Sequence, residues 1–84
     1  MAYAVILRRA AEKELSRLPE KIHQRIAHKL LELENGPRPH GAQKLQGHEG
    51  YRIRIGDYRV LYLIDDKAKT VEVLAVGHRR EVYR

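Results

Sequence analysis

The chain has 84 residues and a mass of 9.8 kDa, which is room for one small domain and not for a separate regulatory or cofactor-binding domain. It has no cysteine, which excludes disulfides, thiolate nucleophiles and thiolate metal sites, and it has no apolar run of 18 residues that would span a bilayer. The N-terminus differs from a signal peptide, because its charges follow the apolar run. We therefore expect a single cytoplasmic domain over residues 1–84.

The charge is strongly basic, with 17 Lys and Arg against 11 Asp and Glu, a formal net charge of +6 and a pI near 9.9. The first 42 residues carry eight basic and five acidic side chains, and the last 42 carry nine and six, so each half has a charge of +3. A charge distributed in this way suggests a nucleic acid or an acidic protein as partner. The alternative is a basic protein without a polyanionic partner.

The first half of the chain predicts a strand followed by two helices. Residues 3–7 form a short apolar run that is typical of a strand. Residues 8–18 and 20–33 have apolar side chains at helical spacing, and Pro19 lies between them, where it suits the first turn of a helix. We expect these two helices to form a hairpin.

The second half predicts a loop followed by strands. Residues 36–50 contain four glycines and two prolines, so they are mostly loop, with a brief strand near residues 44–46. Three strands follow at residues 51–55, 58–64 and 71–76. The order β-α-α-β-β-β predicts an α+β domain in which a two-helix hairpin packs on one face of a small antiparallel sheet.

A two-residue turn at Gly56 and Asp57 fixes the register of the first strand pair. Arg54 is then directly opposite Arg59, with Arg52 on the same face, while the other face is apolar and suited to covering by the helices. Opposed like charges destabilise a sheet by a few tenths of a kcal/mol up to about 1 kcal/mol. This cost suggests that an anion binds there. The alternative is that the long side chains extend separately into solvent.

A short basic tail, residues 77–84, follows the last strand. Arg79 and Tyr83 are expected to join the arginine face. Arginine binds phosphate oxygens bidentately and stabilises the extra charge of a phosphorane-like transition state. A tyrosine can stack on a base or, with a lowered pKa, accept a proton; the alternative is that Tyr83 packs to anchor the tail.

Other motifs offer less. The sequence lacks the HExxH, P-loop and nucleophile-elbow patterns, so it gives no support for metal-dependent hydrolysis, nucleotide hydrolysis or serine-based acyl transfer. Lys21, Arg25 and Lys29 form a basic stripe on the second predicted helix. This stripe is either a solvated face or a surface for phosphate contact or partner docking.

Three blocks in this order resemble the RelE/ParE superfamily of toxins from toxin-antitoxin systems: KLQG at residues 44–47, YRIRIGDYRVLY at residues 51–62, and VGHRREVY at residues 76–83. The resemblance implies a RelE-like fold of the microbial RNase type. It implies a ribosome-dependent endonuclease that cuts mRNA by attack of the RNA's own 2′-hydroxyl on the adjacent phosphate, without a metal or another cofactor. It also implies a complex with a cognate acidic, RelB-like antitoxin. The alternative within the superfamily is a ParE-like toxin that binds and poisons DNA gyrase.

The resemblance also implies roles for particular residues. Four are implied as catalytic: Arg54, Arg59, Arg79 and Tyr83. Arg52 is implied as a contact to RNA or its phosphates, and we expect Lys44, His78 and Arg80 to contact RNA or its phosphates as well. The sequence departs from the best-known relative of the family by having arginine at 52 and 54, where that relative has lysine. Because arginine does not lose its proton in proteins, the general base is left to Tyr83, His78 or the ribosome.

Overall fold

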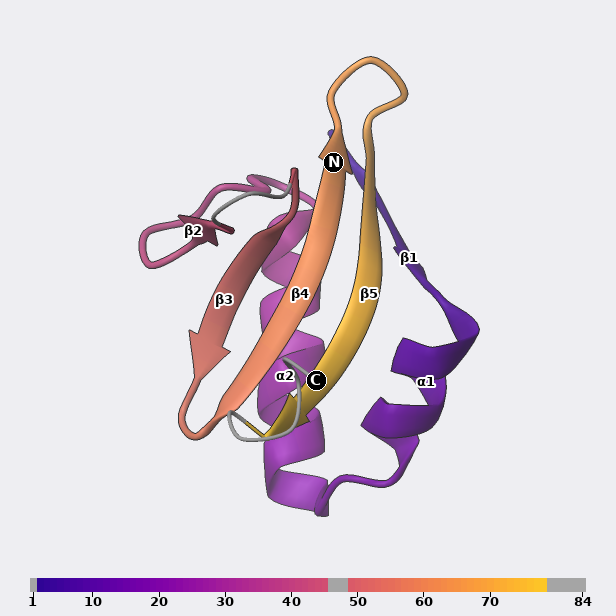
Figure 1. Cartoon of the computed structure of the whole chain (residues 1–84), viewed down its shortest axis with the longest axis vertical. Helices are drawn as coiled ribbons and strands as arrows, with labels where there is room; N and C mark the ends of the chain where they lie inside the picture. Colours follow the sequence, from indigo (N-terminus) through magenta and orange to yellow (C-terminus); the bar gives the residue numbers. More distant parts are fainter. Residues whose placement is uncertain (1, 46–48, 79–84) are drawn as a thin grey trace.

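Five strands form one sheet and two helices cover one of its faces in the computed structural model, which describes residues 2–45 and 49–78 (Figure 1). In chain order the elements are β1 (Ala4–Leu7), α1 (Arg9–Ser16), α2 (Glu20–Leu33), β2 (Gln43–Lys44), β3 (Tyr51–Ile55), β4 (Tyr58–Asp65) and β5 (Thr70–His78). The predicted α+β fold class and element order are confirmed. Neither α1 nor α2 has the length and apolar character that a membrane-crossing helix requires.

The strand order in the sheet is β1-β5-β4-β3-β2. The pairs β2–β3, β3–β4 and β4–β5 are antiparallel, as expected, but β1 lies parallel to β5, with Ala4 opposite Thr70 and Leu7 opposite Val73. The sheet is therefore mixed and not wholly antiparallel. The pattern of a single strand shows which faces it buries, but it does not show which distant strand will pair with it.

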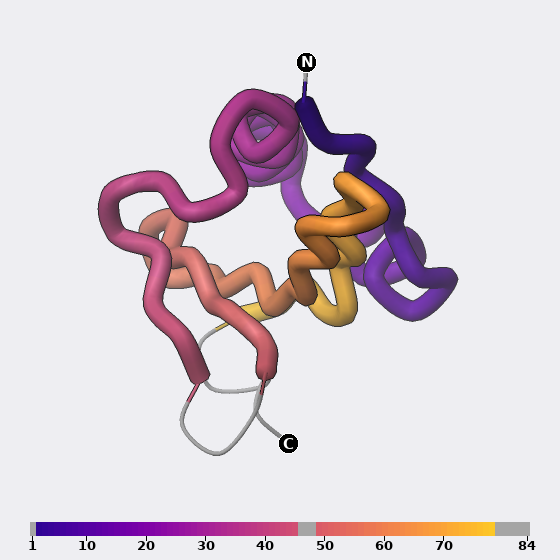
Figure 2. Tube along the Cα trace, turned by 90° about the horizontal axis from the view of Figure 1, so that it is seen from above, coloured from indigo at the N-terminus to yellow at the C-terminus, as the bar shows by residue number. Residues whose placement is uncertain are grey.

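One apolar core lies between the sheet and the helices. Figure 2 shows α2 almost end-on, on one side of the curved sheet. The buried apolar residues are Ala11 and Leu15 from α1, Ile26, Leu30 and Leu33 from α2, and Ile53, Ile55, Val60, Tyr62, Val71, Val73 and Val76 from the strands. The helical spacing of the apolar residues therefore identified the buried faces of both helices.

The β3–β4 hairpin has the predicted register over all five pairs, from Ile55 opposite Tyr58 to Tyr51 opposite Tyr62. Gly56 has a φ of +61°, and Asp57 does not have a positive φ. This combination is that of a type II′ turn, which requires glycine at its first central position. The hairpin therefore places Arg54 directly opposite Arg59.

A β-bulge interrupts the pairing of β4 with β5. Leu61 is opposite Ala75 and Tyr62 is opposite Val73, so Leu74 is an extra residue in β5. A one-residue insertion reverses the alternation of side chains between the two faces. Beyond the bulge, Val76 therefore points into the core, whereas Gly77 lies beside Arg59 on the other face.

Candidate active site

Within the described residues, the sheet face away from the helices carries three arginines. Arg52 and Arg54 come from β3 and Arg59 comes from β4, and together with Gly41 and Gln43 they line a small cavity of about 110 Å³. This volume equals that of about four water molecules in the liquid, which is the scale of a phosphate group. We call this cavity the arginine pocket.

Two of these guanidinium groups are held by backbone carbonyls. Arg54 donates from Nε to the carbonyl oxygen of Gly56 at 3.3 Å, and Arg59 donates from Nη1 to that of Tyr58 at 3.3 Å. Among the described residues, neither arginine forms an ion pair. Their positive charges therefore remain available to an anion that enters the pocket.

The third arginine is oriented by the neighbouring short strand. Arg52 is opposite Gln43 in the β2–β3 register, and its Nε donates to Gln43 Oε1 at 3.1 Å, with a second bond from Nη2 to the same oxygen. Arg52 is partly buried, whereas Gln43 is exposed. The strand β2 thus closes one side of the pocket and holds a guanidinium group in place.

The structure places two of the other predicted RNA contacts on the opposite face of the sheet. Lys44 is opposite Tyr51, whose ring stacks on the ring of Tyr62 on the helix side. His78 is opposite Tyr58, and their rings meet edge to face with centroids 5.6 Å apart. The bulge in β5 accounts for the position of His78. The structure thus brings Arg52, Arg54 and Arg59 together, but not Lys44 and His78 with them.

The remaining predicted site residues, Arg79, Arg80 and Tyr83, lie outside the described part of the chain. Their roles stay predictions. The described part of β5 ends with Gly77 opposite Arg59 and His78 opposite Tyr58.

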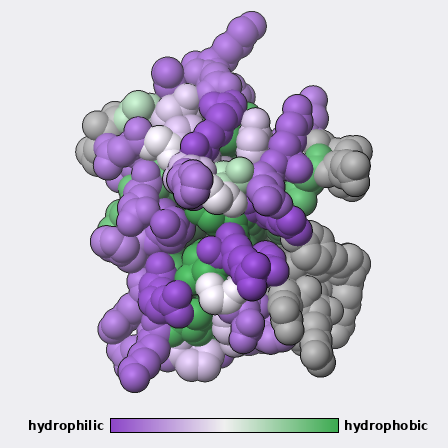
Figure 3. Space-filling model, turned by 90° about the vertical axis from the view of Figure 1, so that its left-hand side faces the viewer, coloured by the Kyte–Doolittle hydropathy of each residue, from purple (hydrophilic) through white to green (hydrophobic). Residues whose placement is uncertain are grey.

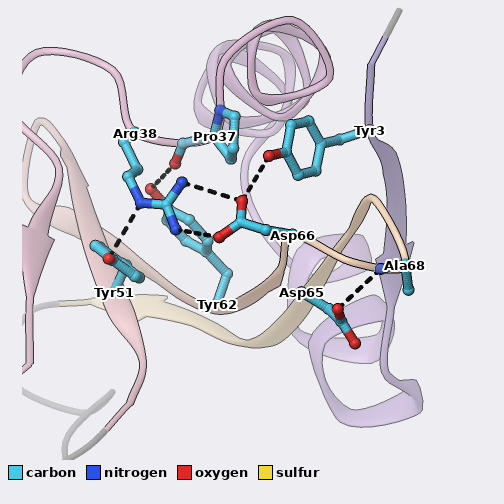
Figure 4. A network of polar contacts seen from close by, with 8 residues as sticks. All are labelled: Tyr3, Pro37, Arg38, Tyr51, Tyr62, Asp65, Asp66 and Ala68. Carbon is cyan, nitrogen blue, oxygen red and sulfur yellow. Dashed lines mark hydrogen bonds and ion pairs between the residues drawn. The ribbon is translucent and has the colours of Figure 1, made fainter.

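A polar network supports the loop that precedes β2 (Figure 4). Arg38 donates from Nη2 to Asp66 Oδ2 at 2.9 Å, from Nη1 to Asp66 Oδ1 at 3.3 Å, and from Nε to the Tyr51 hydroxyl at 3.2 Å. Tyr3 donates its hydroxyl to Asp66 Oδ1 at 2.6 Å, and Tyr62 donates its hydroxyl to the carbonyl oxygen of Pro37 at 2.8 Å. The network therefore joins the residue before β1, the 34–42 loop, strands β3 and β4, and the β4–β5 turn.

The network also shifts the protonation of its members. Hydrogen bonds from Arg38 and then from Tyr3 lower the pKa of Asp66 to about 2, and the bonds to Asp66 and Tyr51 raise the pKa of Arg38. Burial raises the pKa of the Tyr62 hydroxyl to about 12. At neutral pH both groups are therefore charged, and their ion pair links the loop that leads through Gly41 to β2 with the β4–β5 turn.

The contributions of Arg38 and Gln43 were not predicted from the sequence. Arg38 bonds Asp66 across 28 residues, and Gln43 is nine residues from Arg52, so local patterns do not connect them. One available signal was an arginine between two prolines, Pro37 and Pro39, because the prolines restrict the backbone on both sides.

Comparison with known proteins identifies the family. Residues 5–83 match the family described as "ParE toxin of type II toxin-antitoxin system, parDE". The chain belongs to the RelE/ParE family of toxins. It is 37% identical to Toxin RelE of Mycobacterium tuberculosis (strain ATCC 25618 / H37Rv) over 84 residues, which cover 98% of this chain and 87% of that protein. It is 34% identical to the mRNA interferase toxin RelE of Escherichia coli (strain K12) over 88 residues, which cover 99% of this chain and 92% of that protein.

Solved structures of RelE toxins have the same fold. The RelE-RelB complex from Pyrococcus horikoshii OT3 contains a chain that superposes with a TM-score of 0.85 at 32% identity, covering 98% of this chain and 100% of that one. The intact RelBE toxin-antitoxin complex of E. coli contains one with a TM-score of 0.81 at 30% identity, covering 92% and 96%. The resemblance noted in the sequence to the RelE/ParE superfamily is therefore confirmed.

Proposed function

We propose that this RelE/ParE-family protein is the toxin of a toxin-antitoxin system and inhibits translation as a ribosome-dependent mRNA endonuclease. The observation that carries the proposal is the arginine pocket, where Arg54 and Arg59 are directly opposed and have no acidic partner among the described residues. The relative from E. coli is named an mRNA interferase toxin, which supports this function over the binding of DNA gyrase.

The reaction uses a nucleophile supplied by the substrate. The 2′-hydroxyl oxygen of one nucleotide forms a bond to the adjacent phosphorus, and the bond from phosphorus to the 5′-oxygen of the next nucleotide breaks. The hydroxyl proton goes to a base and the leaving oxygen takes up a proton, so the products are a 2′,3′-cyclic phosphate and a 5′-hydroxyl. Negative charge accumulates on the phosphate oxygens in the transition state, and fixed guanidinium groups stabilise that charge.

Each arginine of the pocket has a distinct part in this proposal. Arg59 and Arg54 contact the phosphate oxygens, and Arg52, held by Gln43, positions the RNA strand. Because arginines remain protonated, none of the three accepts the 2′-hydroxyl proton. Tyr83 is our candidate for proton transfer or base stacking, and Arg79 is our candidate for stabilising the leaving oxygen.

We also propose a cognate acidic antitoxin as partner. The chain carries a net charge of +6, which an acidic protein would neutralise. The similar structures from P. horikoshii and E. coli are complexes of RelE with RelB, which supports a hetero-oligomeric toxin-antitoxin assembly.

The test is to induce the protein and map the 5′ ends of translated mRNAs by primer extension. We expect new ends within translated regions for the wild type, and their loss for Arg59→Gln. The control variant is Lys67→Gln, which removes one positive charge from an exposed position in the β4–β5 turn, away from the pocket. This variant should cleave mRNA as the wild type does. An absence of new ends with altered plasmid supercoiling would instead support the gyrase alternative, which the match to the ParE family keeps relevant.

A further inference from the structure

A second cationic groove lies at the edge of the molecule, between α2 and the β3–β4 hairpin. It is open to solvent and has a volume of about 620 Å³. Residues of α2 line one side, and Arg54, Ile55 and Gly56 line the other. Figure 3 looks onto this edge, where hydrophilic side chains surround a strip of apolar atoms. We call this feature the α2 groove.

The cations of α2 face this groove at regular intervals. Lys21, Arg25 and Lys29 are four residues apart, so they lie on one side of the helix, about 6 Å apart along its axis. Lys29 is paired with Glu32, with Nζ 3.0 Å from Oε1. Lys21 and Arg25 are exposed and form no ion pair within the described ranges. The half of the groove near the start of α2 is therefore uncompensated positive charge.

The hairpin continues this charge toward the arginine pocket. Arg54 lines both the α2 groove and the arginine pocket, because it lies on β3 beyond the two residues that pair with β2. Arg25 extends across the groove to the turn, where its Nη1 is 3.5 Å from the position that a Cβ atom at Gly56 would occupy. The two sites thus form one band of positive charge around the edge of the sheet.

We propose that the α2 groove binds the sugar-phosphate backbone of a folded RNA segment, separate from the strand held in the arginine pocket. This inference rests on the proposed function, in which the ribosome supplies such a segment. An RNA backbone carries one negative charge on every nucleotide, which matches the regularly spaced cations of α2 and their continuation through Arg54 into the arginine pocket. An acidic polypeptide matches this arrangement only where its acidic residues happen to fall at the same intervals.

The proposed contact is independent of RNA sequence. Lysine and arginine side chains that meet phosphates fix the position of a protein on nucleic acid without reading bases. The α2 groove would therefore strengthen binding and orient the toxin, whereas the arginine pocket would act on the scissile phosphate. Removing cations from α2 should therefore weaken RNA binding. It should leave unchanged the rate at which bound RNA is cleaved in the arginine pocket.

The experiment compares two double variants with the same loss of charge. Lys21→Gln/Arg25→Gln changes the α2 groove, and Arg9→Gln/Lys13→Gln changes two exposed cations with the same four-residue spacing on α1. The probe is a fluorescein-labelled RNA hairpin with 2′-O-methyl riboses, which has no free 2′-hydroxyl to attack the phosphate. Binding is measured by fluorescence anisotropy over a series of NaCl concentrations.

We expect the groove variant to bind the hairpin about tenfold more weakly than the α1 variant at 150 mM NaCl. Each lost phosphate contact lowers the slope of log K against log [NaCl] by about 0.7–0.9, so two contacts lower it by about 1.5. Equal affinities and slopes for the two variants would overturn the proposal. So would a groove variant that binds RNA like the α1 variant but has lost affinity for a poly-glutamate peptide.

The outcome is separable from that of the proposed function. Because the probe is not cleaved, its binding does not depend on nuclease chemistry. A groove-dependent loss of hairpin binding, in a protein that produces no new mRNA ends, would refute the nuclease and support the groove. Normal mRNA cleavage together with equal hairpin binding by the two double variants would support the nuclease and refute the groove.

Discussion

Replacing Arg54 with glutamine should stabilise the fold while weakening the proposed activity. Arg54 and Arg59 are directly opposite, one step beyond the pair Ile55–Tyr58 that closes the turn. Pairs alternate along an antiparallel hairpin, and this one is of the non-hydrogen-bonded kind, in which opposed side chains approach most closely. Within the described residues no carboxylate offsets either charge.

The size of the effect follows from Coulomb's law. Two unit charges about 7 Å apart in water repel one another by about 0.6 kcal/mol. Screening leaves about 0.5 kcal/mol at 10 mM salt, where the Debye length is about 30 Å, and less than about 0.1 kcal/mol at 1 M, where it is about 3 Å. This agrees with the range of about 0.2–1 kcal/mol for opposed cross-strand charges. For a domain of this size, 0.5 kcal/mol raises Tm by about 2–4 °C.

The assay is urea denaturation of the wild type and of Arg54→Gln at 10 mM and 1 M NaCl. Glutamine keeps a side-chain donor that can replace the bond from Arg54 Nε to the Gly56 carbonyl oxygen. Lys67→Gln removes one charge from the exposed β4–β5 turn and corrects for the general effect of lowering the net charge of +6. A variant that is less stable than the wild type at 10 mM NaCl, or a gain that persists at 1 M, would refute the reasoning.

Three further predictions concern the supports of the fold. Tyr62→Phe should lower the free energy of unfolding by about 1–2 kcal/mol, measured in urea, because it leaves the Pro37 carbonyl oxygen without its buried donor. The pKa of Asp66 is about 2 in the fold and 3.8 ordinarily, so its carboxylate stabilises the fold above about pH 4 and loses that contribution as the pH falls toward 2. Asp66→Asn should therefore flatten the profile of Tm against pH between about pH 4 and pH 2. Gly56→Ala should cost about 1–2 kcal/mol in the same urea assay, since φ there is +61°, and Gly56→Asn should cost less.

The hairpin shows what the sequence was able to predict. A two-residue turn with glycine first determines the register, and the register determines which side chains share a face. The turn at Gly56 and Asp57 was therefore enough to predict that Arg54 lies opposite Arg59. The two helices could also be predicted, because the spacing of their apolar residues is a local property of the sequence.

The features that the sequence did not predict depend on contacts between distant segments. The pairing of β1 with β5 joins residues that are 66 positions apart, and the ion pair of Arg38 with Asp66 joins residues that are 28 apart. The face of His78 was hidden for another reason, because the extra residue Leu74 reverses the alternation within β5. The irregular spacing of Val71, Val73 and Val76 is the trace of that bulge in the sequence.

The parallel pairing of β1 with β5 also has a consequence for biosynthesis. Strand β1 precedes β5 by 66 residues along the chain, so it can pair only when Thr70 to Val73 have been made, and contacts between such distant residues form slowly. A nascent chain that has not yet reached Val73 therefore has no partner for β1 in the sheet. Since β4 carries Arg59 and pairs with β5, the same late segment completes both the sheet and the support of the arginine pocket.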